Sequence, residues 1–97
     1  MNVKELKFRY NIASMMVFEQ VTKQPFALDG SITNLMLLVW SVIEANNPGA
    51  IEFKAMLDHF DECPADMDYL VSELNKQLKV SNSFADGEEK KTANGPA

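Results

Sequence analysis

The feature that most constrains the fold is one apolar segment, residues 32–45, bounded on both sides by helix-terminating residues. Asp29-Gly30-Ser31 precedes it and offers two candidate helix caps, and Asn46-Asn47-Pro48-Gly49 follows it as a dense cluster of breakers. We therefore predict a central core helix over residues 32–45, with Trp40 substantially buried. Its apolar positions are Ile32, Leu35, Met36, Val39, Trp40, Val42 and Ile43.

Three further segments carry helical signals. Asn11 can cap a helix over the apolar residues 12–23, which Pro25 ends, and this first helix should be largely buried. Residues 52–60 place apolar side chains at i, i+3, i+4 and i+7, and Pro64 suits the first position of a fourth helix. The predicted buried stripes of these last two helices are Phe53, Met56, Leu57 and Phe60, then Met67, Leu70, Val71, Leu74 and Leu78.

The first residues follow a different period. Lys7 and Arg9 alternate with Leu6, Phe8 and Tyr10, which predicts one short half-buried strand over residues 3–10. A strand needs a ladder partner, and the rest of the chain offers no second clear alternating run. We therefore expect the partner strand to come from another copy of the chain.

The chain changes composition after Val80, where polar residues and only one large apolar residue, Phe84, follow. Residues 81–97 are accordingly predicted to be a disordered polar tail, and residues 1–80 to be the folded domain. The predicted fold class is mainly α: a small four-helix domain with one short N-terminal β-strand and a disordered C-terminal tail.

Composition excludes several classes of function. The chain has 97 residues, enough for one core, and a net charge of −5, which opposes binding to nucleic acid. The single cysteine cannot form an internal disulfide, and the N-terminus shows no secretion signal. The longest apolar run, residues 35–42, is interrupted by Ser41 and is far shorter than the roughly 20 residues that span a bilayer. We expect a cytoplasmic protein that contacts neither nucleic acid nor membrane.

Potential metal ligands gather in one window, which contains Asp58, His59, Asp61, Glu62 and Cys63. The chain has only one histidine and one cysteine, and neither has a partner at a recognised spacing, so we predict no metal site and no cofactor. A Cys63 nucleophile with His59 as its base would also need an orienting group and oxyanion donors, which no motif supplies. The sequence thus predicts a protein that is not an enzyme.

Six methionines and six phenylalanines are many for so short a chain, and they indicate either gap-filling in a small core or a protein-binding groove.

The charge is unevenly distributed along the chain, because residues 52–73 carry seven acids and one base, whereas residues 1–24 have a net charge of +2. Because like charges repel across an interface, we place contacts between copies of a homo-oligomer away from the acidic helices. The predicted protein-binding residues are Phe8, Tyr10, Met15, Phe18 and Phe26.

Four sequence stretches follow one another in a distinctive order. They are Lys7-Phe8-Arg9-Tyr10-Asn11, the stretch from Phe18 to Phe26, the stretch from Ile32 to Trp40, and Asn46-Asn47-Pro48 with the short acidic helix after it. Together they resemble the tail assembly chaperones of long-tailed phages and prophages. The sequence departs from the family at residue 24, because Gln24 follows Lys23 and the family's glycine is absent. The resemblance implies a cytoplasmic chaperone that coats the tape measure protein and brings tail tube protein to it.

Two other classes of function stay open at this point. A small helical regulator, such as a repressor or an antitoxin-like partner, would need a recognition helix with Lys and Arg, which none of the predicted helices has. A small enzyme would need a catalytic constellation, and the sequence offers none.

Overall fold

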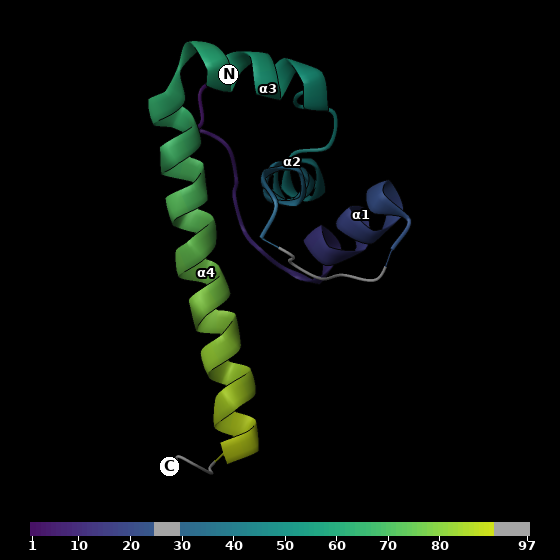
Figure 1. The fold of residues 1–97 in the computed structure, drawn as a ribbon, viewed down its shortest axis with the longest axis vertical. Helices are drawn as coiled ribbons and strands as arrows, with labels where there is room; N and C mark the ends of the chain where they lie inside the picture. Colours follow the sequence, from purple (N-terminus) through teal and green to yellow (C-terminus); the bar gives the residue numbers. More distant parts are fainter. Residues whose placement is uncertain (25–29, 91–97) are drawn as a thin grey trace.

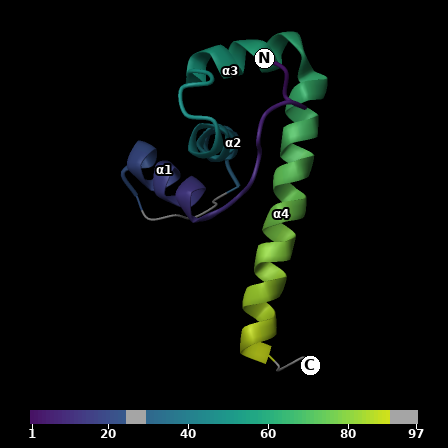
Figure 2. The ribbon, with the colours of Figure 1, turned by 180° about the vertical axis from the view of Figure 1, so that it is seen from behind.

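The computed structural model describes residues 1–24 and 30–90, with residues 80–90 described by their backbone alone. This part of the chain contains four helices and no strand: α1 (Ile12–Thr22), α2 (Ile32–Asn46), α3 (Phe53–Glu62) and α4 (Pro64–Lys90). Helix α2 lies between α1 and α3, and the long helix α4 starts where α3 ends and runs down one side of the molecule (Figures 1 and 2). The mainly α fold class is confirmed, and the first three helices end within two residues of the predicted limits.

Local capping explains where the first two helices begin. The Asn11 side chain accepts a hydrogen bond from the Ser14 backbone N–H at 2.9 Å, and the Ser14 hydroxyl accepts one from the Asn11 N–H, forming a capping box. Ser31 caps α2 in the simpler way, by accepting a bond from the Asn34 N–H at 3.1 Å. These caps satisfy backbone donors that have no partner inside the helix.

The core forms around α2, whose Leu38, Val39, Val42 and Ile43 are almost completely buried. Trp40 is only partly buried, less than the sequence predicts, because its indole lies at the edge of the core. Met36 of α2 also belongs to the core, and the rest comes from the other three helices and from the N-terminal segment. The core residues outside α2 are Val3, Phe18, Met56, Phe60, Leu70 and Leu74.

The prediction of a β-strand over residues 3–10 is wrong. Two side-chain amides take the place of a neighbouring strand and satisfy four backbone groups of this segment. The Asn47 amide accepts a bond from the Lys7 N–H at 3.1 Å and donates one to the Lys7 carbonyl at 2.7 Å. The Gln77 amide accepts from the Tyr10 N–H and donates to the Phe8 carbonyl at 2.9 Å. The segment therefore needs no second copy of the chain to satisfy these groups.

The N-terminal segment lies between α2 and α4 and joins them (Figures 1 and 2). Val3 is buried in the core, and Asn46 donates a further bond to the Arg9 carbonyl at 2.8 Å. The alternation seen in the sequence is genuine, but it reflects a segment with apolar side chains packed against helices and not a sheet.

Helix α4 continues through Lys90, so the backbone remains helical beyond residue 81, where the sequence predicts disorder to begin. No proline interrupts residues 65–90, and each residue added to an existing helix gains a backbone hydrogen bond. Residues 91–97 lie outside the described residues. The division of the chain into a domain over residues 1–80 and a tail stays a prediction.

Candidate functional site

An apolar groove opens between the N-terminal half of α2 and the helix α3. It has a volume of about 270 Å³, and its lining residues are Ile32, Thr33, Met36, Phe53 and Leu57. Ile32 and Met36 lie one turn apart on α2, and Phe53 and Leu57 lie one turn apart on α3, so each helix presents a short apolar row. The groove thus has two apolar walls.

The groove is held open by the way α3 is anchored. Met56 and Phe60 of α3 are buried in the core, which fixes the half-buried Phe53 at the groove. Trp40 packs edge-on against the Phe53 ring, with ring centroids 6.5 Å apart, and its indole N–H donates to the Ile51 carbonyl at 2.9 Å. These contacts set the position of α3 relative to α2 before any partner binds.

The side chain at the groove's opening is unusually exposed for its type. Ile32 is 64% exposed, whereas Met36, which also lines the groove, is 6% exposed. The volume of the groove is slightly below the range of about 300 to 1,000 Å³ that is typical of cofactor pockets. The groove is therefore better suited to one or two apolar side chains of another protein than to a cofactor.

Acidic groups adjoin the groove on α3. Asp61 continues the row of Phe53 and Leu57 by one more turn and is exposed. Asp58 pairs with Lys54 at 3.1 Å, whereas Asp61 and Glu62 are exposed acids on the same helix, so α3 keeps a net negative charge. A partner that places basic side chains beside its apolar ones would complement this helix.

The residues that the sequence singled out for protein binding lie mainly in or against the core. Phe18 is 2% exposed, and Phe8, Tyr10 and Met15 are partly buried. Burial raises the pKa of the Tyr10 phenol above its ordinary value. Phe26 lies outside the described residues. As a protein contact surface, this set stays a prediction.

Helix α1 instead exposes the apolar residues next to those predicted. Ile12 is 75% exposed and Met16, one turn later, is 54% exposed, and Val21 is also exposed. The expectation that α1 is largely buried is wrong, because only Ser14 and Phe18 of this helix are buried. A helix that is apolar on nearly all sides gives no sequence signal of which side faces inward.

The window of potential metal ligands is only partly brought together. His59 and Cys63 come close, and they are joined by Asp66, which lies outside the predicted window, whereas Asp58 pairs with Lys54. Asp66 lies beyond the break between α3 and α4, so no spacing within a single helix pointed to it.

Comparison of the chain with protein-family models, with curated proteins and with solved structures finds no match. Among the described residues, no helix combines the length and the apolar character that crossing a membrane requires.

Proposed function

We propose that this chain is a tail assembly chaperone of a long-tailed phage or prophage. In this role it binds the tape measure protein, recruits tail tube protein, acts in the cytoplasm of the bacterial host and catalyses no reaction. The observation that carries the proposal is the apolar groove between α2 and α3, where Ile32 is left 64% exposed. The sequence resemblance supports the same role independently of this geometry.

The groove favours an amphipathic helix as the bound segment. Such a helix presents apolar side chains at i, i+3 or i+4, a spacing that matches the one-turn separation of Ile32 from Met36 and of Phe53 from Leu57. Met36 adds an unbranched thioether side chain that adapts to different partner side chains. A chaperone that coats a long helical protein must contact many different apolar side chains. An adaptable groove suits this task better than a groove shaped for one side chain.

The exposed apolar row of α1 supports self-association as part of the same role. Ile12 and Met16 lie one turn apart, and both are more than half exposed. Copies that associate through this row could line up along an extended partner and coat it. The tape measure protein would then contact the grooves of several copies.

The proposal is tested by producing the full chain together with the tape measure protein from the same genome and analysing the mixture by gel filtration. We expect a stable complex, which Ile32→Glu weakens at least about tenfold, because the substitution puts a charge into an apolar contact. Asn75→Glu on the exposed part of α4 is the matched control, since it adds the same charge away from the groove. Glu at residue 32 also suits the first turn of α2, so folding should be unaffected.

Each result decides between the functions considered. A complex that survives Ile32→Glu but is lost with changes elsewhere would refute the groove as the binding site. No complex with tape measure or tail tube protein, but a defined complex with a repressor or a toxin, would favour the alternative of a small helical regulator.

A further inference from the structure

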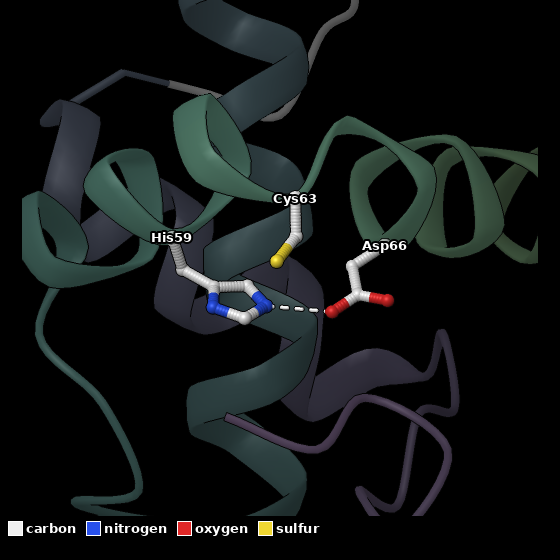
Figure 3. Close-up of side chains that lie close together, drawn as sticks. All are labelled: His59, Cys63 and Asp66. Carbon is white, nitrogen blue, oxygen red and sulfur yellow. Dashed lines mark hydrogen bonds and ion pairs between the residues drawn. The ribbon is translucent and has the colours of Figure 1, made fainter.

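The junction of α3 and α4 gathers three chemically different side chains (Figure 3). His59 lies in the last turn of α3, Cys63 follows the end of that helix, and Asp66 lies in the first turn of α4. The backbone fixes their relative positions, because the Cys63 N–H donates to the His59 carbonyl at 2.7 Å and the Asp66 N–H donates to the Cys63 carbonyl at 3.0 Å.

The functional atoms of these side chains converge on one point. His59 Nε2 lies 2.6 Å from Asp66 Oδ2, and one ligand atom from each of the three residues lies within 4.8 Å of the others. Figure 3 shows the Cys63 sulfur directed toward the imidazole and the carboxylate. His59 and Asp66 are half-buried while Cys63 is exposed, so the cluster is sheltered by protein yet reachable from solvent.

We propose that His59, Cys63 and Asp66 bind one Zn²⁺ ion, with water in the fourth coordination position. Imidazole nitrogen, thiolate sulfur and carboxylate oxygen are the three ligand types that zinc takes in proteins, and the thiolate disfavours Mg²⁺ and Ca²⁺. Tetrahedral bonds to zinc place such ligand atoms about 3.4 to 3.6 Å apart. To bind zinc, the His59 and Asp66 atoms must separate from their present 2.6 Å, while all three ligand atoms already lie within 4.8 Å of one another.

The competing explanation is that His59 and Asp66 form a structural hydrogen bond and that Cys63 takes no part in this interaction. The two explanations differ in what they require of the thiol. A hydrogen-bonded pair does not depend on Cys63, whereas a zinc site loses one of its three protein ligands when the sulfur is removed. The chain has one cysteine and one histidine, so any thiolate signal from a bound ion reports Cys63 alone.

The experiment titrates the full chain, freed of metal by a chelator and kept reduced, with Zn²⁺ alone and with Co²⁺ as a spectroscopic substitute. We expect one ion per chain, a thiolate-to-cobalt charge-transfer band, and a higher melting temperature with Zn²⁺. Cys63→Ser and Asp66→Asn should each weaken Zn²⁺ binding at least about tenfold, because even residues that only support a ligand contribute that much. Asp61→Asn, which changes an exposed acid of α3 outside the cluster, should leave binding unchanged.

Three results would overturn the proposal: no saturable binding, binding that Asp66→Asn leaves unchanged, or one ion per two chains that depends on Cys63 alone. The last result would indicate two thiols from different copies bridging the ion.

Asp66→Asn preserves side-chain shape and an oxygen acceptor, and metal-free melting curves of each variant show whether it is folded. A loss of binding in a folded variant therefore reports a lost ligand. The test of this site is independent of the proposed chaperone role, since it uses no partner protein.

Discussion

Replacing Gln77 by alanine is expected to destabilise the whole domain, although Gln77 is a polar residue outside the core. Its amide makes two hydrogen bonds to a segment about 70 residues earlier in the chain, one with the Tyr10 N–H and one with the Phe8 carbonyl. Both bonds are partly buried, so water replaces them poorly.

The expected loss follows from the two bonds. Each net contribution is about 1 kcal/mol, so Gln77→Ala should lower the free energy of unfolding by about 2 kcal/mol. For a domain of this size that corresponds to a fall in melting temperature of roughly 8 to 16 °C. Alanine is a strong helix former, so α4 itself should not be weakened by the change.

The assay is urea and thermal unfolding followed by circular dichroism, with Asn75→Ala as the matched control. Asn75 is a nearby amide on the same helix but is exposed, so its replacement should change stability by less than about 0.5 kcal/mol. Trypsin supplies a local measurement, since release of the N-terminal segment should speed cleavage after Lys7 and Arg9. Equal stability and equal cleavage for Gln77→Ala and Asn75→Ala would refute the view that this amide holds the segment.

Three further predictions concern the core and the groove. Trp40→Ala should cost about 2 to 4 kcal/mol, because it removes the indole bond to the Ile51 carbonyl and the contact with Phe53; an unchanged denaturation midpoint would contradict this. Leu38→Ala should cost about 3 to 5 kcal/mol in chemical denaturation, since Leu38 is fully buried, and a loss below 1 kcal/mol would show that the core is placed wrongly. Burial raises the pKa of Tyr10, so its neutral form is favoured in the folded state, and stability should fall as the pH rises above about 10. Unfolding measured from pH 8 to 11 should show a smaller fall for Tyr10→Phe, and equal falls would refute this assignment.

The helices were predictable because their signals are local. Asn11 and Ser31 cap the next residues in the chain, and the breakers after Ala45 end α2 within one residue of the predicted limit. Such signals depend only on backbone geometry and near neighbours. The Asn47 and Gln77 amides lie 40 or more residues from the backbone groups that they bond. Nothing in the alternation of residues 3–10 distinguishes a strand partner from such side chains.

The candidate sites were predictable only in part, for a related reason. Phe53 and Leu57 were correctly assigned to the apolar stripe of α3, but periodicity cannot tell a filled contact from an open groove. That distinction depends on how far apart α2 and α3 lie. Asp66 was missed because the predicted ligand window ended at Cys63, before the turn of helix that brings the carboxylate back to His59.

Helix α3 connects the groove to the proposed zinc site, and its attachment decides how well the groove is formed before a partner binds. The Trp40 indole holds the chain just before α3, through the Ile51 carbonyl, and the His59–Asp66 contact holds the last turn of α3 to α4. Between these two points, Met56 and Phe60 are buried in the core. Helix α3 is thus fixed at both ends and along its buried side, so it loses little conformational freedom when a partner binds. This lowers the entropic cost of association. Zinc bound to His59 and Asp66 would replace their hydrogen bond and would hold the same two helices together. Removal of the metal should therefore weaken partner binding less than Ile32→Glu, which acts on the groove itself.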